Sequence, residues 1–180
     1  PCFTIGSWYD FMNQGSIASF QGRQHHGGAG SRGRQQLVIG PWLHGRLNKG
    51  SQNGQLSYPP HAAWPEHEHM IRWFDRWLKG RQNGVDAEPP VRWFVMGAVG
   101  EADAPGNVWR EAADFPPAFN TLPLYIRENG LLSQQLPDSD TGSTSWISDP
   151  LKPCQIPGTA FPGAADARDF EQQAEVRTFT

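Results

Sequence analysis

The sequence has little cysteine, no long apolar run and no concentrated stripe of basic residues. Cys2 and Cys154 are its only cysteines, too few and too far apart to indicate a disulfide framework or to fix a redox compartment. No apolar stretch approaches the ~20 residues that cross a bilayer, so we expect no membrane partner. We also expect no nucleic-acid partner, because Lys and Arg form no basic patch.

Strongly apolar residues are scarce too. Leu, Ile, Val and Phe make up 35 of the 180 residues, just under the level of about 20% that raises suspicion of disorder. Disorder also requires high net charge and few aromatic residues, whereas this chain has a net charge of −3, 8 Trp, 10 Phe and 3 Tyr. With 20 Gly and 16 Pro, the composition predicts a loop-rich globular protein whose core depends on aromatic rings.

Three segments of the first half have the pattern of regular elements. Pro1–Ile5 and Gln36–Ile39 are short apolar runs typical of buried strands. The second should stop at Gly40-Pro41, because proline cannot donate to a strand ladder. Residues 11–21 are compatible with a short helix, and the polar, Gly-rich residues 22–34 with a loop.

A longer helix is predicted from Pro65 to Lys79. Proline is tolerated where a helix starts, and Gly80 is a natural stop. Between them lies a wide amphipathic stripe, formed by Met70, Ile71, Trp73, Phe74, Trp77 and Leu78.

A domain boundary is expected near residue 88, where the charge balance changes sign. Residues 1–88 hold 9 basic and 6 acidic side chains, and residues 89–180 hold 6 and 12. Downstream, short strand candidates at residues 91–96, 122–127 and 176–179 are separated by turn signals, which favours an antiparallel sandwich.

Two residues with catalytic chemistry each follow a predicted strand. Asp10 comes after the strand ending at Ile5, and His44 after the strand ending at Ile39. Ligands of open α/β sheets bind beyond the carboxyl ends of the strands. A hydrolase of the Ser-His-Asp type needs an acid and a histidine there, and in α/β-hydrolases the acid precedes the histidine. The spacing by itself favours the alternative of a loop carboxylate and a solvent-facing histidine.

The surrounding segments resemble the cocaine-esterase and X-Pro dipeptidyl-peptidase (CocE/NonD) family of α/β-hydrolases. Residues 6–10 resemble its G-x-[WY]-[YF]-D segment, and residues 37–45 its G-P-W-x-H-G segment. Residues 73–80 are similar to the F-x-D-x-[WY]-L-K-G end of its last hydrolase-domain helix, and residues 90–97 to the first strand of its jelly-roll domain. Later segments follow in the family's order, so the resemblance covers nearly the whole chain.

This resemblance implies a fold and a set of roles. Residues 1–88 would be the C-terminal portion of an α/β-hydrolase catalytic domain, and residues 89–180 the N-terminal portion of a jelly-roll β-sandwich. Asp10 would be the triad acid and His44 the base. The side chains that would wall a substrate pocket are Trp8, Phe11, Met12 and Trp42. The substrate would be a small ester, amide or peptide, and no cofactor is implied.

The nucleophile is expected outside this chain. The family's serine lies in a G-x-S-x-x elbow between a strand and a helix, upstream of the aspartate, and no such segment is present. Ala29-Gly30-Ser31-Arg32-Gly33 follows a polar loop and lacks the preceding strand, so we reject it. We therefore expect the chain to be an inactive piece of a longer serine hydrolase.

Two other interpretations concern parts of the sequence. His67-Glu68-His69 departs from the zincin pattern H-E-x-x-H and is interpreted as a polar helix face, so no metal site is expected. The chain could alternatively be a non-catalytic module whose β-sandwich binds a carbohydrate or a protein partner, since fold alone does not determine function. Location and oligomeric state are not encoded in any motif found.

Overall fold

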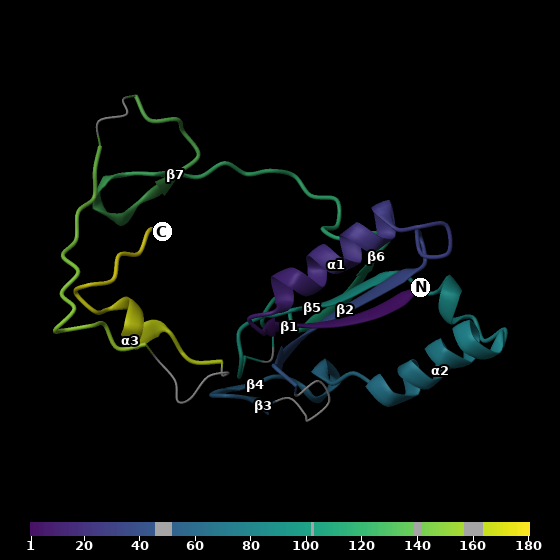
Figure 1. Ribbon diagram of the computed structural model, residues 1–180. Helices are drawn as coiled ribbons and strands as arrows, with labels where there is room; N and C mark the ends of the chain where they lie inside the picture. Colours follow the sequence, from purple (N-terminus) through teal and green to yellow (C-terminus); the bar gives the residue numbers. More distant parts are fainter. Residues whose placement is uncertain (46–51, 102, 139–141, 157–163) are drawn as a thin grey trace. The chain divides into compact units, whose positions relative to one another are not determined.

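The computed structural model describes residues 1–45, 52–101, 103–138, 142–156 and 164–180 (Figure 1). The chain divides into two compact units, one of residues 1–117 with 159–164 and the other of residues 118–158 with 165–180. Neither Cys2 nor Cys154 is in a disulfide. Within the described residues, no helix has the length and apolar character needed to cross a membrane.

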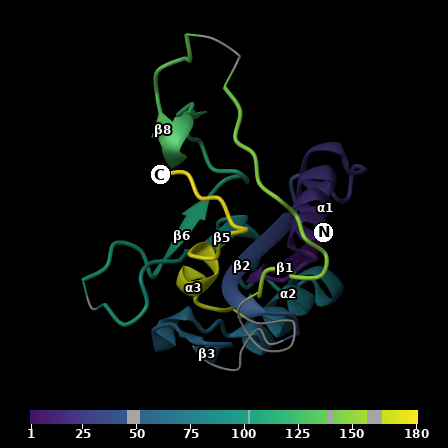
Figure 2. The same ribbon diagram turned by 90° about the vertical axis from the view of Figure 1, so that its left-hand side faces the viewer.

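A four-stranded mixed sheet forms the centre of the first unit. Its order is β1 (Cys2–Tyr9), β2 (Gln35–Leu43), β5 (Val91–Val95) and β6 (Val108–Ala112). Figure 2 shows β2 running between β1 and β5. β2 is parallel to both neighbours, whereas β6 is antiparallel to β5. All nine residues of β2 are buried, as expected for a parallel strand covered on both faces.

Both predicted strands exist and are longer than expected. β1 extends to Tyr9, and β2 continues through Gly40-Pro41 to Leu43. The predicted stop at Pro41 is therefore wrong. Its physical reason is that the register between β1 and β2 shifts at this point, so Pro41 lies where no regular ladder bond is required of it.

Helices α1 (Asn13–His26) and α2 (Glu66–Lys79) cover opposite faces of the sheet (Figure 1). Phe20 of α1 packs against Leu37, Ile39 and Val91 in a fully buried cluster. On the other face, the rings of His69 and Trp73 of α2 contact Phe3 of β1.

The helix α1 is longer than the sequence predicted. It continues to His26, through residues expected to form a loop, and ends at Gly27. Arg23, His25 and His26 occupy its last turn, where basic side chains interact favourably with the helix dipole. Only Phe20 is buried, so the apolar pattern of this helix is weak.

The predicted helix α2 is confirmed. It begins directly after Pro65 and ends before Gly80, whose φ of 69° is left-handed. Trp73 is buried, but Ile71, Phe74 and Leu78 are exposed. The apolar stripe is thus only partly covered by the described residues.

The boundary expected near residue 88 falls inside the first unit. β2, α2 and β5 form a parallel crossover, and Val91 and Phe94 of β5 are fully buried in this unit. The strand predicted at residues 91–96 therefore joins the same sheet as β1 and β2, and β6 follows it at the sheet edge.

Smaller elements complete the first unit. They are the hairpin of β3 (Gln52–Asn53) and β4 (Leu56–Ser57), and the 3₁₀ turns η1 (Pro60–Ala62) and η2 (Val85–Ala87). Tyr58, Ala62 and Phe94 form a second buried cluster beside them.

The second unit contains little regular structure in its described residues. It has the hairpin of β7 (Tyr125–Ile126) and β8 (Leu132–Ser133), the turn η3 (Glu128–Gly130) and the helix α3 (Arg168–Glu171). The strand predicted at 122–127 is reduced to two residues, and residues 176–179 are not a strand.

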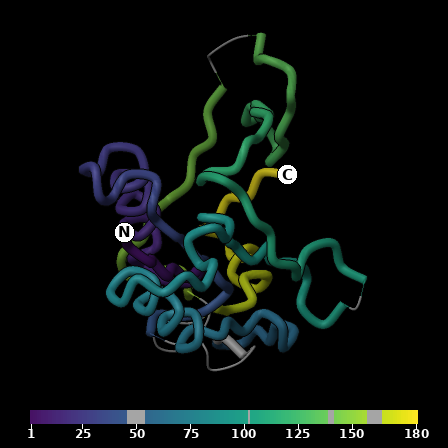
Figure 3. The backbone as a smooth tube through the Cα atoms, turned by 90° about the vertical axis from the view of Figure 1, so that its right-hand side faces the viewer, coloured from purple at the N-terminus to yellow at the C-terminus, as the bar shows by residue number. Residues whose placement is uncertain are grey.

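The C-terminus nevertheless lies beside the hairpin (Figure 3). The backbone N–H of Thr180 donates to the carbonyl of Gly130, and that of Leu132 donates to Thr180. A jelly roll in this part of the protein stays a prediction.

Candidate active site

Asp10 and His44 occupy equivalent positions at the ends of neighbouring parallel strands. Tyr9 and Leu43 are the last paired residues of β1 and β2, and each candidate follows its strand directly. Because the strands run parallel, both residues reach the same edge of the sheet.

The two side chains are hydrogen-bonded. Nδ1 of His44 lies 3.0 Å from Oδ2 of Asp10. The other carboxylate oxygen, Oδ1, accepts a hydrogen bond of 2.8 Å from the backbone N–H of Met12. Both oxygens of Asp10 are therefore engaged, which fixes the orientation of the carboxylate.

This geometry determines the tautomer of a neutral His44 ring. An ionised carboxylate only accepts hydrogen bonds, so Nδ1 carries the proton and Nε2 has the free lone pair. The His44 side chain is 49% exposed and the Asp10 side chain 16%. Within the described residues Nε2 makes no hydrogen bond, so this nitrogen is chemically suited to accept a proton.

A tight turn holds Asp10 at the end of β1. The Asp10 N–H donates to the carbonyl of Ser7, and the Asn13 N–H donates to the carbonyl of Asp10. The chain passes from this turn directly into α1, so the carboxylate lies on a short connection between two regular elements.

A pair of tyrosines that the sequence did not indicate lies next to the site. The hydroxyls of Tyr9 and Tyr58 are 2.5 Å apart, and the Tyr58 hydroxyl donates to Sδ of Met96. Burial and the hydrogen bond with Tyr9 raise the pKa of Tyr58 far above its usual value, so its phenol stays neutral. The pair links the end of β1 to the segment before η1.

The four predicted pocket residues lie in different surroundings. Phe11 and Met12 are exposed, and the Phe11 ring centroid is 5.1 Å from that of His44. Trp8 is half-buried, and its indole N–H donates to the carbonyl of Phe94. Trp42 is fully buried in the core. Phe11 and Met12 are thus the two that lie at the surface beside the Asp10–His44 pair.

Ser31, at the centre of the rejected Gly-rich segment, lies far from His44. It precedes β2, whereas His44 follows the same strand. A nine-residue strand is about 30 Å long. The hydroxyl of Ser31 accepts a hydrogen bond from the side chain of Gln35, and this serine is not within reach of the imidazole.

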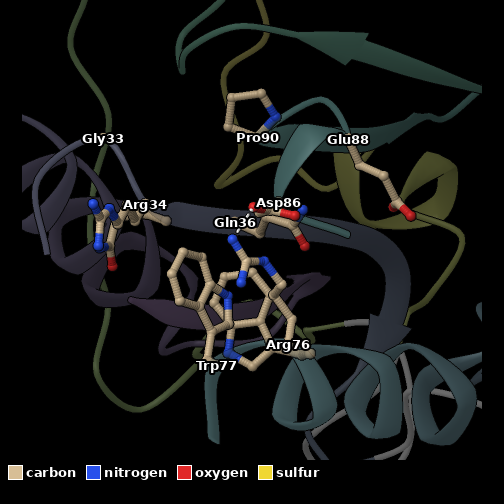
Figure 4. Close-up of a pocket in the computed structure, with 10 residues that line it drawn as sticks. Gly33, Arg34, Gln36, Arg76, Trp77, Asp86, Glu88 and Pro90 are labelled. Carbon is tan, nitrogen blue, oxygen red and sulfur yellow. Dashed lines mark ion pairs between the residues drawn. The ribbon is translucent and has the colours of Figure 1, made fainter. Parts of the chain in front are cut away.

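A cavity of about 470 Å³ lies at the beginning of β2, and Figure 4 shows residues that line it. Arg76 and Asp86 form an ion pair of 2.7 Å in its wall, and the hydrogen bond from Arg76 lowers the pKa of Asp86. Gln36 and Trp77 also line it. The Asp10–His44 pair lies at the carboxyl end of β2. This cavity lies near the amino end of the same strand and is therefore a different site.

The two histidines of α2 lie in different surroundings. His67 is exposed and His69 is buried. Nε2 of His69 is 2.8 Å from Oε1 of Gln36, and burial lowers the pKa of His69. The interpretation of both residues as a polar surface is wrong for His69. In the described part of the chain, no three His, Cys, Asp or Glu residues form a cluster that could hold a metal ion.

Known proteins resemble this chain in sequence. A putative serine esterase of Mycobacterium bovis is 29% identical over 118 residues, which are 63% of this chain and 16% of the relative. The cocaine esterase of a Rhodococcus species is 26% identical over 199 residues, covering 100% of this chain and 32% of the relative. The chain thus spans a third or less of these relatives. No protein-family model matches it.

Solved structures resemble it in fold. An aminopeptidase from a marine sediment archaeon of the Thaumarchaeota superposes with a TM-score of 0.66 at 21% identity, over 97% of this chain and 29% of its own. A CocE/NonD family hydrolase from Staphylococcus aureus superposes with a TM-score of 0.51 at 23% identity, over 75% and 20%. The fold is therefore hydrolase-like, with a mixed sheet.

Proposed function

We propose that the chain belongs to the CocE/NonD family of hydrolases, which its similarity to the cocaine esterase and to the CocE/NonD hydrolase supports, and that it carries the acid and the base of a Ser-His-Asp triad. The parent protein would be a serine hydrolase that cleaves ester or amide acyl bonds. The observation that supports this most directly is the hydrogen bond of 3.0 Å between Nδ1 of His44 and Asp10. The nucleophilic serine and the oxyanion hole belong to a part of the parent protein outside these residues.

The proposed mechanism assigns one task to each residue. His44 Nε2 takes the proton of the serine hydroxyl as the serine attacks the acyl carbonyl, and then gives it to the leaving alcohol or amine. Asp10 keeps the proton of the neutral ring on Nδ1 and stabilises the imidazolium that forms. The Met12 N–H and Phe11 ring support the pair from the residues that follow Asp10.

The same proposal includes the finer fold assignment. Residues 1–88 would be the C-terminal portion of an α/β-hydrolase domain, with β1, β2 and α2 as its last elements. Residues 89–180 would be the first part of a jelly-roll domain, and its first strand, β5, pairs with β2 of the hydrolase portion.

The non-catalytic binding module is the less favoured alternative. A module that binds a carbohydrate or protein partner has no need of a carboxylate and an imidazole hydrogen-bonded at adjacent strand ends. The oriented pair therefore favours hydrolysis.

Replacement of His44 by Ala in the full-length protein tests the proposal. We expect kcat for an aryl ester to fall by about 10⁴-fold or more, because the serine loses its base. The control is His67→Ala, which removes another exposed histidine of the same unit and should leave kcat unchanged. Near-normal hydrolysis by His44→Ala would contradict the assignment. Parallel assays with aryl esters and X-Pro peptide amides would define the acyl substrate.

A further inference from the structure

The strand β2 has one more residue than β1 beside the Asp10–His44 pair. Ser7 is paired with Gly40, and Tyr9 with Leu43. Between these two pairs β1 advances by two residues and β2 by three. An extra residue of this kind is a β-bulge, which bends its strand and redirects the side chains that follow.

The bulge determines which residue lies beside Asp10. In an unbroken register, Tyr9 would pair with Trp42, and Asp10 would lie level with Leu43. His44 would come one residue later, on the opposite face, because a slip of one residue turns each side chain to the other side. With the bulge, Asp10 and His44 are both the first residue after the last pair.

The indole of Trp42 packs onto Gly40 inside this bulge. Trp42 is fully buried, and a Cβ atom built on Gly40 would collide with atoms of its ring. Only glycine leaves room for the ring to lie against the backbone of its own strand. The intervening Pro41 has no N–H to leave unsatisfied where the regular ladder is interrupted.

Contacts from two other segments hold the same ring. The indole N–H of Trp42 donates to the carbonyl of Ala62 over 3.0 Å, and Ala62 is itself buried. The Trp109 ring of β6 lies with its centroid 5.8 Å from that of Trp42. Trp42 is thus held on several sides, two residues before His44.

We infer that Gly40 and Trp42 are positioning residues for His44: the indole packed on Gly40 and bonded to Ala62 holds the bulge that sets the imidazole against Asp10. Gly40 and Trp42 are both buried, and neither is assigned a contact with the substrate. This inference rests on the proposed function of the Asp10–His44 pair, and it gives Trp42 a role different from the pocket wall predicted from the sequence.

Three variants of the full-length protein test the inference. Gly40→Ala places a methyl group against the Trp42 ring, and Trp42→Phe keeps a ring but removes the N–H bonded to Ala62. The matched control is Trp73→Phe, which truncates another buried tryptophan of the same unit, on α2. Each variant is examined for kcat, KM, thermal unfolding and the NMR signal of the hydrogen-bonded Nδ1 proton of His44.

We expect kcat to fall about 100-fold in Gly40→Ala and about 10-fold in Trp42→Phe, with KM changed less than twofold, because small misplacements of a catalytic group have effects of this size. The Nδ1 proton signal should weaken in both variants and persist in Trp73→Phe. If Gly40→Ala does not fold, Trp42→Phe decides the result.

The outcomes separate this inference from the function on which it rests. If His44→Ala abolishes hydrolysis while Gly40→Ala and Trp42→Phe retain normal kcat and the proton signal, the positioning role is wrong and the proposed function stands. Equal losses of kcat in Trp42→Phe and Trp73→Phe would also contradict the positioning role. If His44→Ala hydrolyses esters normally, the proposed function itself fails.

Discussion

Nδ1 of His44 lies 3.0 Å from Oδ2 of Asp10, although 34 residues separate the two in sequence. The distance results from the parallel pairing of β1 and β2, which ends at Tyr9 and Leu43 immediately before the two residues. The sheet therefore supplies the geometry, and the Met12 N–H fixes the second oxygen of the carboxylate.

Asp10→Asn should lower kcat of the full-length enzyme by about 10⁴-fold, with little effect on the fold. The amide can donate to Nδ1, so it favours the tautomer whose proton lies on Nε2, where the serine proton must go. Steady-state ester hydrolysis measures the loss. A fall of less than tenfold would mean that Asp10 does not orient the ring.

Tyr58→Phe should lower the free energy of unfolding by about 1–2 kcal/mol, because it removes the bonds to Tyr9 and Met96. The double variant with Tyr9→Phe should be destabilised by less than the sum of the single variants, since their effects share one hydrogen bond. Denaturant unfolding of the full-length protein measures all three. Additive effects would contradict the coupling of the two hydroxyls.

The stability of the protein should fall as the pH decreases below about 6.5, and His69 should contribute to this. Burial lowers its pKa; Glu88 opposes this, whereas Arg92 and Arg72 lower it further. The folded state then binds fewer protons than the unfolded state just below the unfolded pKa, so acidification favours unfolding. The contribution is complete above that pKa and is lost as the pH falls toward the folded value.

Unfolding measured at pH 7 and pH 5 in His69→Gln, with His67→Gln as the exposed control, isolates this effect. The pH dependence should be weaker in His69→Gln and unchanged in the control. The same dependence in all three proteins would show that His69 is not responsible.

Two glycine-to-alanine variants should have opposite effects on stability. Gly80 has a φ of 69° at the end of α2, so Gly80→Ala should destabilise the protein by about 1–2 kcal/mol. Gly22 lies within α1, where an added Cβ meets open space, and Gly22→Ala should stabilise it by up to about 1 kcal/mol. Thermal unfolding compares the two, and a shift in the same direction would contradict the backbone argument.

Local patterns predicted some elements of this fold well and others poorly. α2 was predictable because Pro65 and Gly80 bracket a strong apolar period. The end of α1 was not, since Phe20 is its one buried residue and the helical pattern is correspondingly weak. The end of β2 was predicted too early because of Pro41. A bulge in the pairing with β1 lies at this residue, so no backbone N–H is needed there.

Some features of the candidate site were likewise predictable from local sequence, and others were not. The positions of Asp10 and His44 at strand ends followed from apolar runs and motifs, so their proximity could be expected. The hydrogen bond between Tyr9 and Tyr58 joins residues that are 49 apart in sequence, and no local sequence pattern predicts it. Similarly, β5 pairs with β2 through a crossover that includes α2, and the change in the sign of the charge balance near residue 88 does not indicate this pairing.

The most direct measurement is the labelling of the full-length protein with a fluorophosphonate probe, followed by mass spectrometry of the labelled peptide. We predict one labelled serine that lies outside these 180 residues, and labelling that is nearly abolished in His44→Ala but retained in His67→Ala. Stoichiometric labelling of a serine within these residues, or undiminished labelling of His44→Ala, would contradict the assignment of Asp10 and His44 as acid and base.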